Sequence, residues 1–396
     1  MSTQRLWTKE FIVAIIVNLF MSSVFYMLLT SMALYAVQEF QATETMAGLA
    51  ASGFIIGAIF GRLFSGKFLD FIGRRRLLVL SMVLYVVASV AYIPVSNLSL
   101  LIGLRIIHGL AFGAGNTAVV AGVQGIIPRT RRAEGNGYFG TASTISTAIG
   151  PFAAVYLSER FDFTMVFLAS SACAVAALIA SWFFTIPERR LSEAEVAEKW
   201  QFNLKSFIDI GALRIGSIML ISGLAYATVL SFLATHTEEL GIGESASTFF
   251  MTYAVVALLA RLFVGRLQDK YGDNVIAVPV FIAFGIGLFL IGIAQIATHI
   301  IMAGIILGFG FGTLLPSMQS ILINQVPGTR VGVATSTFFL LLDIGSGLGP
   351  VILGVLVEAV GFATMFQGAT VLAAMAGFLY FLFHGRSAAR GAHAVA

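Results

Sequence analysis

Twelve apolar runs, each long enough to cross a lipid bilayer, constrain this chain more than any other feature of its sequence. An α-helix needs roughly 20 residues to span the hydrocarbon layer. Because the runs are continuous and do not alternate between apolar and polar residues, they predict helices and not the strands of a membrane barrel. The approximate bounds of the runs are 11–36, 46–65, 77–95, 99–126, 137–157, 164–186, 210–234, 247–267, 275–295, 299–325, 331–357 and 363–384.

The proportion of charged residues places these helices in lipid. Of the 396 residues, 58% are apolar and only 11% are charged. A soluble domain of this size needs many more charges to cover its surface. The first run exceeds the short apolar core of a cleaved signal peptide, so we predict that it stays as a helix. The chain is therefore predicted to be an all-α integral membrane protein.

The distribution of lysine and arginine predicts the orientation, since positive residues in short loops stay in the cytoplasm. With both termini cytoplasmic, every Lys and Arg lies at a cytoplasmic helix end except Arg105, within a helix, and Arg160, in an outer loop. The net charge of +4 is thus a topology signal and gives no reason to expect nucleic acid as a partner. Short loops and cytoplasmic termini suit a bacterial inner membrane.

An internal duplication organises the chain. RLFSGKFLDFIG at residues 62–73 recurs 199 residues later as RLFVGRLQDKYG at 261–272, and the same offset aligns Phe112 with Phe311, Pro128 with Pro327 and Gly150 with Gly349. Repeats of six helices keep one orientation, so an axis along the membrane normal is expected to relate two six-helix bundles. We predict bundles at residues 1–187 and 206–396, joined by a cytoplasmic linker with a short surface helix at 188–205.

Three motifs carry a family resemblance. GKFLDFIGRRR at 66–76 resembles the loop signature of the major facilitator superfamily, LIGLRIIHG at 101–109 its fourth-helix motif, and GYFGTASTISTAIGP at 137–151 the fifth-helix motif associated with antiporters. Phe71, His108 and Ala154–Val155 depart from the usual residues. The resemblance covers essentially the whole chain and implies a secondary transporter, most similar to the twelve-helix drug:proton antiporters.

The repeated phrase is predicted to act as a conformational latch. Its glycines allow close helix approach and a tight turn, and its acid is placed to bind neighbouring basic side chains or a helix N-terminus. The resemblance implies that this latch closes the cytoplasmic side of the outward-facing state, whereas a positive-inside anchor is the alternative. Asp273 replaces Arg74 in the second copy, so the two latches are expected to differ in strength. The predicted latch residues are Gly66, Asp70, Gly73, Arg74, Gly265, Asp269 and Gly272.

Ionisable residues within the hydrocarbon layer are costly and often functional. Asp343 lies 13 residues after Arg330, about 20 Å along a helix and thus near the midplane. It is either a proton carrier or a structural carboxylate at a glycine-rich helix contact. His108 is a second candidate for proton coupling, or a neutral hydrogen-bonding residue. Arg105 stays charged, so its coupling role is limited to attracting an anion or shifting the pKa of a neighbour.

The resemblance implies a central cavity lined by the first, fourth, seventh and tenth helices. Pro316 is expected to interrupt its helix locally. For each residue the alternative is helix packing, the role predicted for Gly150, Pro151, Gly349 and Pro350. The candidate cavity residues are Asn18, Ser22, Tyr26, Thr30, Arg105, Phe112, Asn116, Tyr226, Pro316 and Gln319.

Motifs for other chemistry are missing from the sequence. It has no GxxxxGK[ST] phosphate loop, no HExxH and no CxxC, and its one cysteine, Cys173, lies in an apolar run. We therefore expect no cofactor and no metal, and a transporter in preference to a membrane enzyme or sensor. Proton-coupled export of amphiphilic, drug-like molecules is the leading hypothesis. The alternative is a proton-coupled carrier of a defined metabolite, such as a sugar, an organic acid or a metal-chelating small molecule. The expected partners are a small-molecule substrate, protons and lipid, around a monomer.

Overall fold

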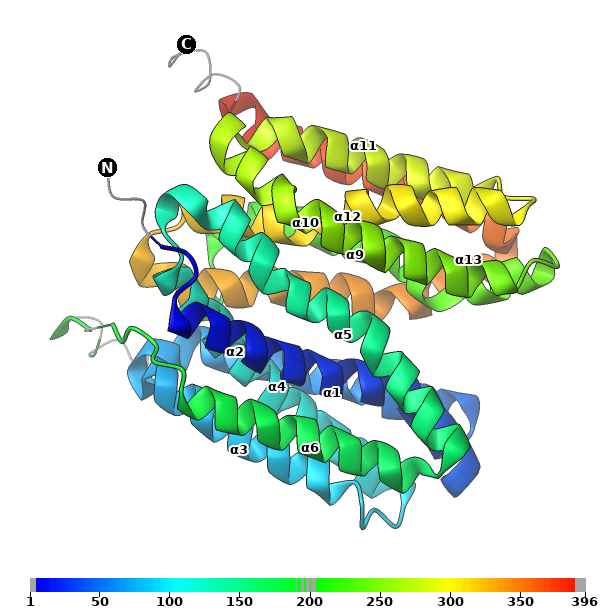
Figure 1. The fold of residues 1–396 in the computed structure, drawn as a ribbon, viewed down its shortest axis with the longest axis horizontal. Coiled ribbons are helices and arrows are strands. Elements are labelled where there is room, and N and C mark those ends of the chain that lie inside the picture. Colours follow the sequence, from blue (N-terminus) through cyan, green and yellow to red (C-terminus); the bar gives the residue numbers. More distant parts are fainter. Residues whose placement is uncertain (1–4, 190, 194–195, 197–199, 201–203, 389–396) are drawn as a thin grey trace. The chain divides into compact units, whose positions relative to one another are not determined.

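The computed structural model describes residues 5–189, 191–193, 196, 200 and 204–388, and within them it contains helices and no strands. The helices are α1 Lys9–Phe40, α2 Glu44–Ile72, α3 Arg74–Ala91, α4 Leu98–Ile126, α5 Arg132–Arg160, α6 Phe163–Trp182, α8 Leu204–Phe207, α9 Ile210–Glu239, α10 Glu244–Tyr271, α11 Asp273–Gly292, α12 Ala297–Gln325 and α13 Val331–Tyr380. Figure 1 shows long helices, and neighbouring helices such as α3 and α6 run in similar directions.

Local chemistry fixes where several helices begin. The side chains of Thr8, Thr43, Asn97 and Asp162 each accept a hydrogen bond from the backbone N–H three residues later, at the starts of α1, α2, α4 and α6. Such caps satisfy amide groups that have no partner inside the helix. Helices of the predicted kind therefore begin at sequence signals that can be recognised without the fold.

The prediction of an all-α chain with twelve helices is confirmed. Within the described part of the chain, nine of the helices are also long and apolar enough, by length and composition alone, to cross a membrane. Most helices extend beyond the predicted runs by a few residues, and two differences have a clear cause in the backbone. α3 begins at Arg74, three residues before the predicted run, because the turn between α2 and α3 is a single residue, Gly73 at φ 95°. The last two predicted helices both lie within α13. This helix is interrupted at Gly361, because a φ of 76° is not a helical conformation.

The contacts divide the chain into two compact units. Unit 1 comprises residues 1–128, 145–209 and 327–337, and unit 2 comprises residues 129–144, 210–326 and 338–396. Relative to the predicted bundles, the start of α5 thus belongs to unit 2 and the start of α13 to unit 1. The predicted linker helix at 188–205 falls partly outside the described residues, and the bundle boundaries at 187 and 206 remain a prediction.

Glycine contacts hold unit 1 together. α2 and α4 pack so closely that a Cβ atom on Gly57 or Gly61 would collide with the backbone of α4, and one on Gly109 or Gly113 with that of α2. Close backbone approach of this kind maximises van der Waals contact between helices in lipid. α6 then packs on α1 and α3, and the neighbouring ribbons of α3 and α6 are seen in Figure 1.

Unit 2 repeats this arrangement with the glycines on one side only. α12 carries Gly304, Gly308 and Gly312 at intervals of four residues, and each meets α10, at Phe249, Tyr253 and Ala257 respectively. On its other side α12 packs against α11, where Gly310 closely approaches Phe284. The duplicated helix pairs α2–α4 and α10–α12 are therefore the tightly packed centres of the two units.

Candidate functional sites

The first latch, formed by Gly66, Asp70, Gly73 and Arg74, lies in unit 1 against the start of α13. A Cβ atom on Gly66 would lie 2.6 Å from the Cβ and Oγ atoms of Ser336, so only glycine fits this contact. The Ser336 hydroxyl donates a hydrogen bond of 2.5 Å to the carbonyl oxygen of Arg62. Ser336 gives no motif signal in the sequence, and it becomes recognisable only through this contact.

Asp70 of the first latch binds basic side chains. The Nε atom of Arg74 donates to Asp70 Oδ1 at 2.7 Å, and Nη1 of Arg189 lies 3.4 Å from Asp70 Oδ2. The side chain of Asp70 is 13% exposed, which strengthens both interactions relative to a surface pair. Of the two arrangements that the sequence left open, the first latch thus takes pairing with neighbouring cations.

The second latch, formed by Gly265, Asp269 and Gly272, lies in unit 2 against the start of α5. A Cβ atom on Gly265 would collide with the backbone of Ala133. The two carboxylate oxygens of Asp269 accept hydrogen bonds from the backbone N–H groups of Ala133, at 3.0 Å, and Glu134, at 2.9 Å. Asp269 thus binds the N-terminus of α5, where the helix dipole favours a negative charge. This is the other arrangement that the sequence allowed.

Further ionisable side chains lie around the second latch. Glu134 accepts two hydrogen bonds from Arg131, at 2.6 and 2.8 Å, and one from Arg266 at 2.7 Å. The Glu134 carboxylate raises the pKa of the Arg131 guanidinium in the turn before α5. Asp273, which stands where the first copy has Arg74, lies 2.8 Å from Nε2 of His384. Of these partners, Arg266 belongs to the repeated phrase itself, whereas Arg131 and His384 come from outside it.

The candidate residues of α4, which are Arg105, His108, Phe112 and Asn116, lie in the interior of unit 1. Arg105 is fully buried and donates to the carbonyl oxygens of Ala50, at 2.9 Å, and Ala51, at 3.0 Å, both on α2. His108 is also fully buried, and its ring nitrogens lie 3.2 Å from Ser89 Oγ and 3.1 Å from Tyr92 Oη. In this conformation neither side chain presents a surface to a ligand, so the predicted cavity role of Arg105 requires the helices to move.

The other two candidate residues of α4 contact neighbouring helices. Phe112 stacks on Phe25 of α1, with ring centroids 5.4 Å apart. The Oδ1 atom of Asn116 accepts a hydrogen bond of 3.0 Å from Arg62, the first residue of the repeated phrase. In the second copy the corresponding Arg261 donates to the carbonyl oxygen of Gly312 on α12. Both arginines are buried at the tight helix pair of their unit, a role that the sequence analysis did not assign.

The four candidate cavity residues of α1 become more exposed along the helix. Asn18 and Ser22 are buried, Tyr26 is half-buried and Thr30 is exposed. Gly150, from the predicted packing set, meets this helix at Tyr26, where a Cβ atom would lie 2.7 Å from the Tyr26 Cβ atom. One turn earlier, the hydroxyl groups of Ser146 and Ser23 lie 3.1 Å apart. The fifth-helix glycine motif therefore brings α5 against α1.

Unit 2 repeats that contact between α9 and α13. A Cβ atom on Gly345 would collide with Leu220, and one on Gly349 with Ala227. Asp343 lies on α13 just before these glycines and is half-buried. Pro151 and Pro350 lie within α5 and α13, directly after Gly150 and Gly349.

The remaining cavity candidates are buried in unit 2. Tyr226 of α9 stacks on Phe311 of α12, with ring centroids 3.8 Å apart. Pro316 is buried within α12. The helix continues through this residue, where the sequence predicted a local interruption. Gln319, one turn further on, is 3% exposed, and its Nε2 atom has no hydrogen-bond partner among the described residues. The Nη1 atom of Arg105 is in the same position, so Gln319 and Arg105 are the cavity candidates with hydrogen-bonding capacity left open for a ligand among the described residues.

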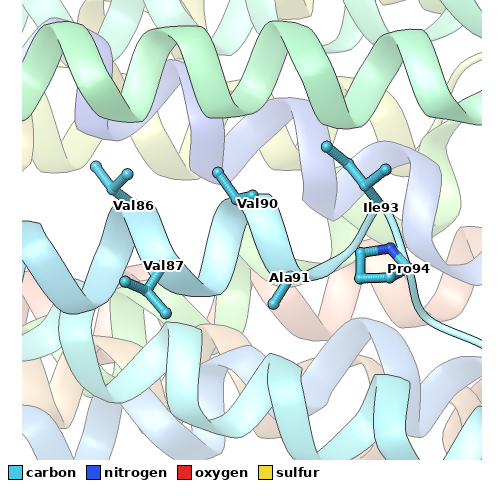
Figure 2. Close-up of a pocket in the computed structure, with 6 residues that line it drawn as sticks. All are labelled: Val86, Val87, Val90, Ala91, Ile93 and Pro94. Atoms are coloured by element: carbon cyan, nitrogen blue, oxygen red, sulfur yellow. The ribbon is translucent and has the colours of Figure 1, made fainter.

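An apolar hollow lies at the end of α3 (Figure 2). It has a volume of about 450 Å³ and is lined by Val86, Val87, Val90, Ala91, Ile93 and Pro94. An apolar lining on an exposed helix face suits lipid chains better than a ligand that needs hydrogen bonds. We assign no substrate site to it.

Comparison with known families decides what this arrangement of paired helices is. The family model of the Major Facilitator Superfamily matches residues 14–218 and again residues 215–394. The chain belongs to the Major Facilitator Superfamily. Its members are secondary transporters of small molecules, so the protein is a multi-pass membrane transporter and not an enzyme. The two matches meet near residue 215, which agrees with the duplication seen in the sequence.

Relatives within the superfamily differ in their cargo. The chain is 25% identical to an uncharacterized MFS-type transporter of Methanocaldococcus jannaschii, over 89% of this chain and 92% of the relative. It is 22% identical to the staphylopine export protein of Staphylococcus aureus, over 82% and 84%. It is 23% identical to the multidrug resistance protein MdtG of Dickeya zeae, over 91% and 90%. Family membership therefore fixes the class of protein and leaves the cargo open.

A solved structure of the superfamily has the same fold. The human organic anion transporter TETRAN superposes with a TM-score of 0.78 over 94% of this chain and 99% of its own, at 14% sequence identity. At that identity the likeness concerns the fold alone. The twelve-helix architecture predicted from the apolar runs is thus the architecture of a known transporter.

Proposed function

We propose that this superfamily member exports small amphiphilic organic molecules in exchange for protons, opening to one side of the membrane at a time. The observation that carries the proposal is Asp343, a half-buried acid in the apolar helix α13. Acids held at that depth are rare and mark ion and proton pathways. The close contacts of Gly345 and Gly349 with α9, on the same helix as Asp343, support a tightly packed helix pair next to this acid.

The nature of the cargo follows from the residues available to bind it. The predicted cavity residues are mostly neutral, with aromatic and amide side chains such as Tyr226 and Gln319. Such a set suits amphiphilic molecules that need few specific contacts. Similarity to a multidrug resistance protein, at 23% identity, supports the same class of cargo.

A second candidate function is proton-coupled transport of one defined metabolite. Arg105 favours it, because this buried guanidinium binds neutral carbonyl groups and forms no ion pair with an acid in the described part of the chain. A carboxylate on the substrate would satisfy that charge once the helix face opened. Similarity to the staphylopine export protein, which is named for one compound, supports this alternative.

The proposed setting is a bacterial inner membrane with both termini in the cytoplasm. The clustering of Lys and Arg at one set of helix ends supports this orientation. In that orientation both latches lie on the cytoplasmic side, and protons enter from outside as cargo leaves.

Everted membrane vesicles with an imposed pH gradient test the proposal. Each compound in a panel of cationic, neutral and anionic organics is added, and collapse of the gradient is recorded for the wild type, Asp343→Asn and Asp343→Glu. We expect particular compounds to collapse the gradient in the wild type and, more slowly, in Asp343→Glu, which keeps a titratable carboxyl group. We expect no collapse in Asp343→Asn.

Two outcomes would change the proposal. Equal responses in the wild type and Asp343→Asn would remove Asp343 from the proton pathway and leave it as a structural carboxylate. Responses limited to carboxylate compounds, and lost in Arg105→Gln, would favour the defined-metabolite transporter.

A further inference from the structure

The beginning of the linker between the predicted bundles contacts the first latch within unit 1. Glu188 accepts hydrogen bonds from the backbone N–H groups of Arg74, at 2.9 Å, and Arg75, at 3.0 Å, which are the first two residues of α3. Gly73, which precedes this helix, has no side chain with which to cap it. The carboxylate of Glu188 supplies that cap from a distant part of the sequence and complements the helix dipole.

The next residue joins two segments of unit 1. Nη1 of Arg189 lies 3.4 Å from Asp70 Oδ2, at the end of α2, and donates to the carbonyl oxygen of Thr329 at 3.0 Å, in the turn before α13. One guanidinium group thus connects the acid of the first latch to the segment against which that latch packs.

The residues just after the predicted linker, Phe207 and Asp209, contact the same two segments. Asp209 forms an ion pair of 2.5 Å with Arg330, and its backbone N–H donates to Thr337 Oγ1 at 2.9 Å. The Nζ atom of Lys67 in α2 lies 4.8 Å from the ring centroid of Phe207. The first residues of the linker and the residues just after it therefore contact both the end of α2 and the segment at the start of α13.

Among the residues that the structure describes, no linker contact comparable to that of Arg189 is found at the second latch, whose acid binds its helix directly. Asp269 binds two backbone N–H groups of α5, whereas the hydrogen bonds of Asp70 in the described structure go to the side chains of Arg74 and Arg189. The contact of Asp70 with the segment before α13 thus passes through Arg189.

We propose that Glu188 and Arg189 are positioning residues of the transport cycle, which hold the first latch closed by tying the α2–α3 turn to the start of α13. The inference rests on the proposed function, since the latch has a role only in a protein that alternates between conformations. Arg189 and Asp70 are 19% and 13% exposed, so water can reach both groups. The contact of Arg189 with Asp70, at 3.4 Å, is longer than that of Arg74, at 2.7 Å, so it is the weaker of the two and the one that can break and re-form during a cycle.

The test measures opening of the latch without any substrate. Cys173 is the one cysteine of the chain, so Cys173→Ser with Ser336→Cys gives a single reporter thiol at a fully buried position under Gly66. Labelling of this thiol by a membrane-impermeant maleimide is followed in everted vesicles. Arg189→Gln is compared with Arg189→Lys and with Arg76→Gln. The Arg76→Gln variant removes an equal charge at an exposed side chain in the first turn of α3.

We expect Arg189→Gln to raise the labelling rate about tenfold, the factor for one lost charge-assisted hydrogen bond. Arg189→Lys should restore most of the protection, and Arg76→Gln should leave the rate unchanged. Equal rates in all variants would overturn the proposal, as would an equal rise in Arg76→Gln. The native Cys173, labelled in Arg189→Gln without the reporter, is the control for folding. Faster labelling of Cys173 by the same factor would reduce Arg189 to a general structural residue.

Labelling does not depend on cargo or on protons, so it separates this proposal from the proposed function. A tenfold rise in a protein that collapses no pH gradient would support the positioning role and count against drug export. Unchanged labelling in a protein that does exchange drugs for protons would do the reverse.

Discussion

At the scale of single residues, Asp70 and Asp269 show how one repeated acid serves two different contacts. Both stand at the same place in the duplicated phrase, yet Asp70 binds two arginine side chains and Asp269 binds two backbone N–H groups. The difference follows from the fourth residue beyond each acid. Arg74 provides a cation one turn after Asp70, whereas Asp273 repels Asp269 at the equivalent place and leaves it to the N-terminus of α5.

Replacement of Asp70 tests the latch at this scale. Asp70→Asn should keep the fold and lower the transport rate about tenfold, because the neutral amide loses its charge-assisted bonds to Arg74 and Arg189. Gradient collapse in everted vesicles measures the rate. Asp162→Asn is the control, since asparagine caps α6 as well as aspartate does. Full turnover in Asp70→Asn would leave the repeated phrase as a topology anchor only.

Asp269→Asn should act on stability as well as on rate. Asparagine keeps one acceptor oxygen for the N-terminus of α5 but loses the second hydrogen bond and the charge, a loss of about 0.5–2 kcal/mol by analogy with helix caps. The expected result is a lower melting temperature in detergent for Asp269→Asn than for Asp70→Asn. Identical melting temperatures would show that the two latches contribute equally despite their different partners.

At the scale of helices, the glycines of α2 and α4 decide how the first unit packs. Gly57, Gly61, Gly109 and Gly113 leave no room for a side chain, so the two backbones are in direct contact. In lipid there is no hydrophobic effect between helices, and such contacts supply much of the association energy. The same sequence feature at Gly103, also on α4, has open space around it, so glycine alone does not predict a contact.

This difference gives a matched pair of variants on one helix. Gly109→Ala places a methyl group against the backbone of Phe54 and should destabilise the protein by about 1–3 kcal/mol, the usual cost of overpacking. Gly103→Ala meets no atom within contact distance and should be neutral. Thermal unfolding in detergent, followed by size-exclusion chromatography, measures both. A neutral Gly109→Ala would mean that α2 and α4 separate easily.

At the scale of the whole molecule, the orientation in the membrane is the property on which both proposals depend. In a Cys173→Ser background, Glu239→Cys lies at the end of α9 on the predicted outer side, and Ser387→Cys lies beyond α13 on the predicted cytoplasmic side. Both side chains are exposed. An impermeant maleimide should label Glu239→Cys in intact cells and Ser387→Cys only in everted vesicles. The reverse pattern would place the latches outside the cell.

The sequence predicts the membrane class, the twelve helices and the duplication without any tertiary information. Each of these properties depends on local or additive physics: the length of apolar runs, the cost of charges in lipid and a constant offset between similar residues. The positions of Gly66, Gly73 and Gly150 also signal close approach, and the structure places each of them at a contact or a turn. The boundary residue of α3 is fixed in the same local way, by the positive φ of Gly73.

The partners of these residues depend on the fold. Ser336 beneath Gly66, Glu188 on the start of α3 and Arg189 beside Asp70 lie more than a hundred residues from the groups that they contact. Nothing local distinguishes Arg189 from Arg76, because an ion pair depends on distance in space and on burial. The apolar runs and the placement of charges along the sequence are therefore enough to predict that this chain crosses a membrane. Which of its charges meet depends on the fold, since such contacts require segments distant in the sequence to be brought together.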